Sequence, residues 1–324
     1  MTRSQILAFR RHVGALDERL PRSARSLRRA AWAGLQDSMP RAALLSIHAR
    51  VKGAHPEIWD DPALVQVWGP RFSVFVVPAQ DHAVFTVGRY PDDEKGRRVV
   101  EERAAELHRV LDGKRVRDRD LGMSNGVRRA TSTGTVLIRW EGARAPVVWN
   151  VPRPKIAPLD ARIELARRYL HVYGPTTVPA FAKWAGIGAG EARNAFDALQ
   201  LTAVRTPIGE AWILPADEEA FRGEHEPAPA RLLPSGDSYF LLQGVDRELL
   251  VRDAKLRNEL WTPRVWPGAV LVRGEIAGTW RRAQAKLSVQ PWRKLSKDER
   301  EAVEAEAASL PLPDIEGQVS VSWS

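Results

Sequence analysis

The strongest pattern in the sequence lies at residues 160–214, DARIELARRYLHVYGPTTVPAFAKWAGIGAGEARNAFDALQLTAVRTPIGEAWIL. Apolar side chains recur at helical spacing in three successive stretches, and two short strand-like stretches then flank Pro207-Ile208-Gly209. Three helices followed by a hairpin are typical of a winged helix. The predicted elements are helices 160–173, 177–185 and 190–200 and strands 203–206 and 211–214. The predicted core consists of Ile163, Ala166, Leu170, Val178, Phe181, Ala195, Phe196 and Leu199.

A similar order of elements occurs twice nearer the N-terminus, and the chain changes character after Glu224. The sequence therefore predicts an α+β fold of three tandem winged helices, at 1–90, 91–155 and 156–224, followed by a small C-terminal β subdomain at 225–324 with a terminal helix. The further predicted elements are helices 4–13, 23–33 and one beginning at Pro40, strand 71–77, helix 94–111, helical pieces 117–123 and 125–130, hairpin strands 135–140 and 146–150, strands 238–243, 265–273, 275–280 and 286–291, and helix 297–308.

Composition excludes several classes of protein. With 324 residues, of which 44% are hydrophobic, the chain is long enough for about two domains with their own cores. No apolar run approaches the roughly 20 residues that span a bilayer, and the N-terminus shows no export signal, so we expect a cytoplasmic protein without a membrane partner. Because cysteine is absent and the seven histidines are scattered, we expect no metal, and no motif indicates a cofactor.

Basic residues are concentrated in the N-terminal half. Residues 1–155 hold 28 Lys and Arg against 17 Asp and Glu, a net charge of +11, whereas residues 156–324 hold 21 against 23. Forty of the 49 basic residues are Arg, whose planar guanidinium binds phosphates through paired hydrogen bonds. A GC-rich coding sequence would also enrich Arg, but it does not explain the difference between the halves. The predicted DNA-binding residues are Arg22, Arg25, Arg28, Arg29, Arg41, His48, Arg128, Arg129 and Arg193.

The helix that begins at Pro40 is predicted to have two faces. Leu44, Ile47 and Val51 follow the spacing of an inward apolar face. The outward face then shows Arg41, Leu45, His48 and Lys52.

The turn before that helix, Gln36-Asp37-Ser38, places three polar side chains in a row beside a helix N-terminus, which favours anions. One interpretation is structural: Asp37 or Ser38 caps the helix and Gln36 bonds the turn. The other is functional: a neutral amide and a carboxylate face a groove walled by arginine, where the sugar of a nucleic acid can bind. The local sequence leaves both open.

Four segments resemble one known family. They are residues 35–50 (LQDSMPRAALLSIHAR), Trp68-Gly69-Pro70-Arg71, Asp246-Arg247 with Leu249-Leu250, and residues 274–281 (GEIAGTWR). Together they look like the bacterial winged helix DNA-binding domain family, which includes DNA glycosylases that remove N-alkylated purines and unhook interstrand crosslinks. The resemblance covers nearly the whole chain, in the same order of tandem winged helices and β subdomain.

The resemblance implies a double-stranded DNA partner, a monomer, and a DNA glycosylase that acts on N-alkylated purines or crosslinked bases without a cofactor. Family enzymes carry Gln-x-Gln or Gln-x-Asp at the turn, whereas here Gln36 matches the first position, Ser38 takes the third and the acid stands at Asp37. The implied catalytic residues are Gln36, which orients water, Asp37, which stabilises charge or acts as a base, and Ser38, which caps the helix or takes the third place. The alternatives are a non-catalytic DNA-binding or regulatory protein on the same scaffold, and a ligand- or protein-binding scaffold, which the +11 half disfavours.

Overall fold

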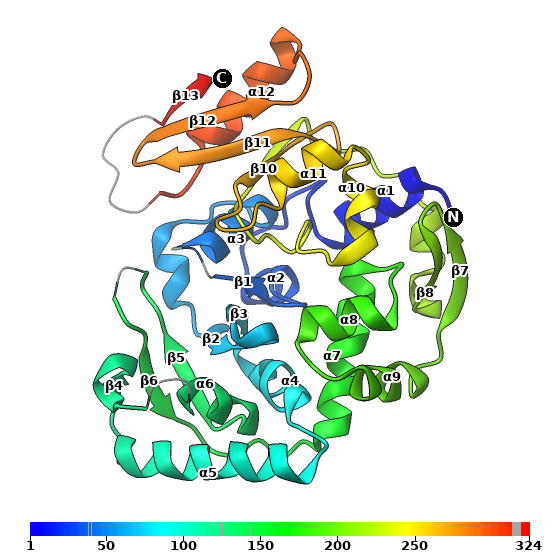
Figure 1. Cartoon of the computed structure of the whole chain (residues 1–324). Helices are drawn as coiled ribbons and strands as arrows, with labels where there is room; N and C mark the ends of the chain where they lie inside the picture. The colour runs from blue at the N-terminus through cyan, green and yellow to red at the C-terminus, as the bar shows by residue number, and fades with distance from the viewer. Residues whose placement is uncertain (38, 40, 124–125, 143, 313–318) are drawn as a thin grey trace.

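The third predicted unit has the helices and the hairpin that its sequence indicates. Thr177 precedes the second helix, where its side chain accepts a hydrogen bond from the backbone N–H of Ala180, and Gly186 ends that helix in the left-handed conformation. Phe181 is fully buried, as predicted. The computed structural model describes residues 1–37, 39, 41–123, 126–142, 144–312 and 319–324 (Figure 1). The elements of this unit are α7 (Pro158–Tyr173), α8 (Val178–Ala185), α9 (Ala189–Asp197), β7 (Thr202–Thr206) and β8 (Gly209–Ile213).

The first unit combines short helices with a three-stranded antiparallel arrangement. Strand β3 (Val74–Pro78) covers most of the predicted strand 71–77, and β2 (Leu64–Trp68), which the sequence analysis does not include, pairs with it. Leu44, Ile47 and Val51 lie in the core of this unit, as predicted. The remaining elements are α1 (Arg3–Val13), α2 (Ala24–Ala30), β1 (Leu35–Gln36), α3 (Ala42–Arg50) and α4 (His82–Thr86).

The first two units share one sheet. Its six strands run in the order β1-β3-β2-β5-β6-β4, and the junction is the pairing of β2 with β5 at Gln66 and Ile138. The long helix α5 runs beside β4–β6 on the outer edge of the molecule (Figure 1). The two predicted winged helices are therefore joined through backbone pairing. The elements of the second unit are α5 (Glu94–Leu111), β4 (Val116–Arg117), α6 (Gly126–Ala130), β5 (Val136–Arg139) and β6 (Val147–Asn150).

The C-terminal residues form a five-stranded sheet in the order β13-β12-β11-β10-β9, covered by α12 at one end of the molecule (Figure 1). The predicted strand 238–243 is wrong: its apolar side chains are buried, but this backbone lies in turns and irregular structure. A short apolar run predicts a buried strand even where its residues fill the core without forming one. The elements are β9 (Ala230–Leu233), α10 (Arg247–Leu250), α11 (Ala254–Leu260), β10 (Gly268–Val272), β11 (Glu275–Ala283), β12 (Lys286–Pro291), α12 (Lys297–Ala308) and β13 (Ser320–Trp323).

The predicted outward face of α3 is covered by this C-terminal subdomain, which corrects the expectation for Leu45 and His48. Leu45 packs in the core of the C-terminal sheet, and His48 is only 6% exposed, with its ring 3.1 Å from the Ser309 hydroxyl. Burial lowers the pKa of His48 to about 3, and nearby arginines add to the effect, so the ring is neutral. His48 is therefore an interior side chain and is not a DNA contact.

A buried ion pair fixes α3 to the same subdomain. Both guanidinium nitrogens of Arg50 lie 2.7 Å from the carboxylate oxygens of Asp237, and the Ser46 hydroxyl donates to the same carboxylate. Because both charges are almost fully buried, each needs the other to offset the loss of its hydration. This pair holds the end of α3 against residues far along the chain.

Candidate active site

Gln36 lies at the end of β1 and borders a cavity of about 450 Å³. Its side-chain oxygen Oε1 accepts a hydrogen bond from Nη2 of Arg71 at 3.0 Å, which fixes the orientation of the amide. Three further cavity residues, Arg247, Arg264 and Trp266, come from the C-terminal subdomain. None of the lining residues that the structure describes is acidic, so the cavity is suited to an anionic partner with a flat group to stack.

Arg71 is held in place by the third unit. The backbone of Arg71 adopts the left-handed conformation, with φ of 54°, which costs free energy for any residue other than glycine. Nη1 donates to the backbone carbonyl of Trp184 at 2.8 Å, and a Cβ added at Gly186 would come within 3.0 Å of the Arg71 backbone. The turn between α8 and α9 therefore requires glycine because it packs against the residue that orients Gln36.

The charge of Arg71 lies close enough to two other guanidinium groups to change their pKa values. Burial lowers the pKa of Arg89 to about 9, and the charge of Arg71 adds to this effect. Burial and the charge of Arg71 also lower the pKa of Arg247, whose guanidinium lies 5.4 Å from the ring centre of Trp266. Since like charges at close range repel, this region gains stability from a bound anion.

Asp37 points away from the cavity, into the protein. Its carboxylate accepts hydrogen bonds from the backbone N–H of Ala43 at 3.0 Å and from the side-chain amide of Gln66 at 2.9 Å, and it is 1% exposed. Gln66 in turn accepts from the backbone N–H of Trp140, at the end of β5. Burial raises the pKa of Asp37 to about 7 against the lowering effect of these hydrogen bonds. Asp37 thus bonds the first turn of α3, as in the structural interpretation, although the N-cap position itself is Arg41, and Ser38 lies outside the described residues.

The predicted DNA-binding residues do not line the Gln36 cavity. Arg22, Arg25 and Arg29 are exposed near or on α2, as are Arg128 and Arg129 on α6 and Arg193 on α9. Arg28 and Arg41 are half-buried, and Arg28 donates to the side chain of Gln80. Arg25, Arg28 and Arg29 instead border a separate cavity of about 350 Å³, together with Trp32 and His171. The structure brings these three together, whereas Arg128 and Arg129 lie on α6 and Arg193 lies on α9.

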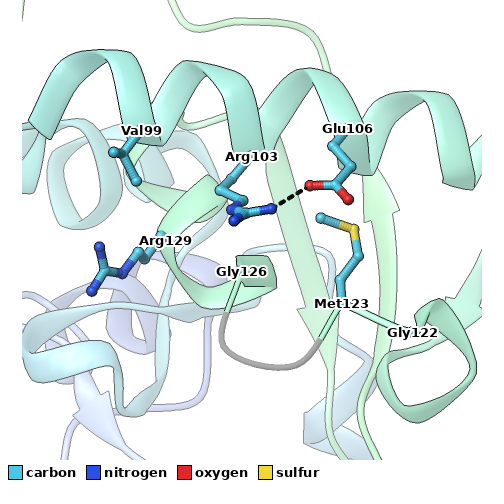
Figure 2. Close-up of a pocket in the computed structure, with 7 residues that line it drawn as sticks. All are labelled: Val99, Arg103, Glu106, Gly122, Met123, Gly126 and Arg129. Carbon is cyan, nitrogen blue, oxygen red and sulfur yellow. Dashed lines mark hydrogen bonds and ion pairs between the residues drawn. The ribbon is translucent and has the colours of Figure 1, made fainter. Parts of the chain in front are cut away.

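A further cavity, of about 340 Å³, lies between α5 and α6 beside Arg129 (Figure 2). On its α5 side Arg103 forms an ion pair with Glu106 at 2.7 Å. Arg129 also borders a larger cleft of about 810 Å³ that extends to Asn194 on α9. The cleft therefore connects the basic helix of the second unit with the third helix of the third unit, which carries Arg193.

Sequence reasoning missed most residues that surround Gln36. Arg71 and Arg247 lie inside segments that resemble the known family, but no role is predicted for them. Trp266 falls in the stretch 265–273, which is predicted only as a strand, and Arg264 lies directly before it. The local signal at Arg71 is its position directly after Gly69-Pro70, where a turn places a side chain away from the strand.

Within the described residues, no helix is long and apolar enough to cross a membrane. In the same part of the chain, no group of three or more His, Cys, Asp or Glu side chains is placed to hold a metal ion.

Comparison with known proteins gives three consistent matches. The family model described as DNA glycosylase AlkZ-like matches residues 29–311. An interstrand DNA cross-link repair glycosylase from Streptomyces sahachiroi is 27% identical over 159 residues, which are 47% of this chain and 43% of that protein. The match thus spans less than half of the curated relative's length. The solved structure of the DNA glycosylase AlkZ from the same organism has a TM-score of 0.81 and 19% identity, with all of both chains covered, which shows a common fold.

Proposed function

This chain belongs to the DNA glycosylase AlkZ-like family, and from that premise we propose that it is a DNA repair glycosylase. In this proposal it binds double-stranded DNA and hydrolyses the N-glycosidic bond of an N-alkylated purine or a crosslinked base. The observation that carries the proposal is the Gln36 amide, which Arg71 orients at the edge of a cationic and aromatic cavity.

The chemistry needs an oriented water rather than a strong acid. The carbonyl oxygen of Gln36 has two lone pairs, of which Arg71 uses one, so the second can accept a hydrogen bond from the attacking water. The C1′–N bond breaks and its electron pair leaves with the base, which neutralises an N7-alkylguanine that is already cationic. Water then forms the new C1′–O bond and loses a proton to solvent. No cofactor takes part in this hydrolysis.

The other side chains have binding and positioning roles in this proposal. Arg247 and Arg264 bind phosphates that flank the lesion, and Trp266 provides a surface for stacking. Asp37 acts from inside the protein, because its carboxylate oxygens accept hydrogen bonds from the backbone N–H of Ala43 and the side-chain amide of Gln66. It is therefore a positioning residue, which departs from the base or charge-stabilising role that the resemblance implies.

We further propose that the chain is built from three tandem winged helices, at 1–90, 91–155 and 156–224, with a β subdomain at 225–324. The order of three helices and a hairpin from α7 to β8 supports a winged helix at 156–224. In this proposal DNA also contacts Arg128, Arg129 and Arg193, and the supporting observation is that Arg129 borders a cleft that extends to Asn194 on α9. The enzyme in this proposal is a cytoplasmic monomer.

Base release is the direct test. A duplex with N7-methylguanine and an interstrand-crosslinked duplex are incubated with the wild type, with Gln36→Ala, and with Gln290→Ala, which removes an exposed glutamine on β12. We expect Gln36→Ala to lower the rate of base release by about 100-fold or more, because it removes the group that orients water, and to leave the dissociation constant for DNA within about twofold. The control retains the wild-type rate.

Two results would contradict the proposal in different ways. A wild-type rate in Gln36→Ala removes Gln36 from the catalytic role. Salt-dependent DNA binding by the wild type, without release of either base, supports a non-catalytic DNA-binding protein instead.

A further inference from the structure

Three arginines of α2 border a cavity that takes no part in the proposed reaction. Arg25, Arg28 and Arg29 follow the i, i+3, i+4 spacing that places side chains on one face of a helix. This face lines the cavity of about 350 Å³ that also contains Trp32, and we call it the α2 cavity. Among the described residues, the α2 cavity and the Gln36 cavity have no lining residue in common, so they are separate sites.

The positive charge of this helix face is not balanced by carboxylates. Among the residues that the structure describes, none forms an ion pair with Arg25, Arg28 or Arg29. The lining residue Asp81 is acidic, but its carboxylate lies 3.1 Å from Nη1 of Arg168, which neutralises it. Three guanidinium groups on one helix face repel one another, and a bound anion offsets this repulsion. The α2 cavity is therefore suited to a phosphate group.

Trp32 gives the α2 cavity an aromatic wall in a fixed position. The guanidinium of Arg168 lies 4.0 Å from the centre of the Trp32 ring, and Glu164 holds that guanidinium at 2.8 Å. Arg168 is not a lining residue, so the ring meets the cavity on another side. Aromatic side chains beside arginine are typical of sites where a base stacks and its phosphate is bound.

A side-chain amide and the size of the cavity complete this picture. Nη1 of Arg28 donates to Oε1 of Gln80 at 3.1 Å, which fixes both side chains at the wall. This bond uses the oxygen of Gln80 and does not engage its NH₂ group, which can donate to a base. Pockets for small molecules start at about 300 Å³, so the α2 cavity has room for a ligand of the size of one nucleotide.

We propose that the α2 cavity binds one nucleotide, with Arg25, Arg28 and Arg29 at its phosphate and Trp32 against its base. A nucleotide within a DNA strand and a free mononucleotide share this chemistry, and the experiments below distinguish the two. The site does not depend on hydrolysis at Gln36, because it uses different residues.

Titration calorimetry with deoxyadenosine monophosphate (dAMP) tests the free nucleotide. Arg25→Gln and Arg29→Gln each remove one charge from the α2 cavity. The matched control is Arg109→Gln, which changes an exposed arginine on α5 that does not line this cavity. We expect each cavity variant to weaken dAMP binding about tenfold, because each removes a hydrogen bond to a charged group, and the control to stay within about twofold of the wild type.

Two changes at Trp32 test the contact with the base. Trp32→Leu should weaken dAMP binding about tenfold and leave the binding of inorganic phosphate unchanged, whereas Trp32→Phe keeps a ring and should stay within about threefold of the wild type. Equal weakening of both ligands in Trp32→Leu would contradict the base contact. Thermal unfolding checks that the variants fold. If Trp32→Leu does not fold, equal affinities of the wild type for dAMP and inorganic phosphate would contradict the contact instead.

An undamaged DNA duplex, titrated at several salt concentrations, tests the other source. If a DNA strand supplies the nucleotide, Arg25→Gln and Arg29→Gln should each reduce the slope of log Kd against log salt by about one, and Arg109→Gln should leave it unchanged. Weaker binding of dAMP with unchanged binding of the duplex would instead identify a free mononucleotide as the ligand.

The inference is overturned if Arg25→Gln and Arg29→Gln bind both dAMP and the duplex as the wild type does. It is equally overturned if Arg264→Gln weakens dAMP binding while the two α2 variants do not, because the nucleotide then occupies the Gln36 cavity. Base release from a duplex with N7-methylguanine is measured separately. Failure of the wild type to release that base contradicts the proposed function, whereas the dAMP titrations still decide whether the α2 cavity binds a nucleotide.

Discussion

Replacing Asp37 with Asn should remove a large pH dependence from the stability of the protein. The carboxylate is almost fully buried, and burial raises its pKa from 3.8 to about 7. The folded protein therefore binds a proton at Asp37 more tightly than the unfolded chain does. The stability that this proton contributes is fully present below pH 3.8 and is lost as the pH rises through about 7. Asn does not ionise, so the free energy of unfolding of Asp37→Asn does not fall in this way.

The size of the effect follows from the two pKa values. Each tenfold difference in proton affinity corresponds to about 1.4 kcal/mol. Between pH 5 and pH 8 the folded carboxyl loses its proton while the unfolded carboxyl is already ionised. The free energy of unfolding of the wild type should therefore fall by about 3 kcal/mol relative to that of Asp37→Asn over this interval.

Urea unfolding followed by tryptophan fluorescence at pH 5, 6, 7 and 8 measures this difference. Asp197→Asn, which changes an exposed carboxylate on α9, is the matched control and should stay parallel to the wild type. Parallel curves for the wild type and Asp37→Asn would refute the reasoning about burial. Folded Asp37→Asn should also retain base release to within about tenfold, and a loss of about 100-fold would instead give Asp37 a direct role in catalysis.

Three other changes have defined outcomes. Gly186→Ala should lower the free energy of unfolding by about 1–3 kcal/mol, because it adds a Cβ at positive φ against the Arg71 backbone. The control Gly190→Ala adds a Cβ in open space and should be neutral or slightly stabilising, so equal melting temperatures of the two variants would contradict this prediction. Asp237→Ala should cost about 3–5 kcal/mol, since it leaves a buried guanidinium without its partner, and a loss below about 1 kcal/mol in denaturant unfolding would show otherwise. Arg193→Gln should reduce the slope of log Kd against log salt by about one, and an unchanged slope would remove this residue from the DNA contact.

Local sequence patterns predict the bounds of an element correctly where the residues of that element determine them. Helices 94–111 and 297–308 and strand 286–291 have the observed bounds because their periodicity, caps and turns lie within the segment itself. The family resemblance read from the turn at 35–50 and three other segments is confirmed by the family model.

The errors arose where distant segments decide the outcome. The sequence of α3 has no feature that distinguishes a face open to DNA from a face covered by β9 and α12, so the prediction for His48 is wrong. The same limit applies to the candidate site. Alternation along β1 sends Gln36 toward the cavity and Asp37 into the protein, but only the fold shows that Arg71 and Arg247 meet there.

Residues from distant parts of the chain form the cavity, so the cavity is complete only late in the synthesis of the chain. Trp266 follows Gln36 by 230 residues, and the carbonyl that holds Arg71 belongs to Trp184. At 5–20 residues per second, a ribosome needs roughly 10–50 s to pass from one side of this cavity to the other. During that interval the nascent polypeptide displays basic helices without a complete site. For the proposed glycosylase, base release must therefore wait until the C-terminal subdomain has been translated and has docked.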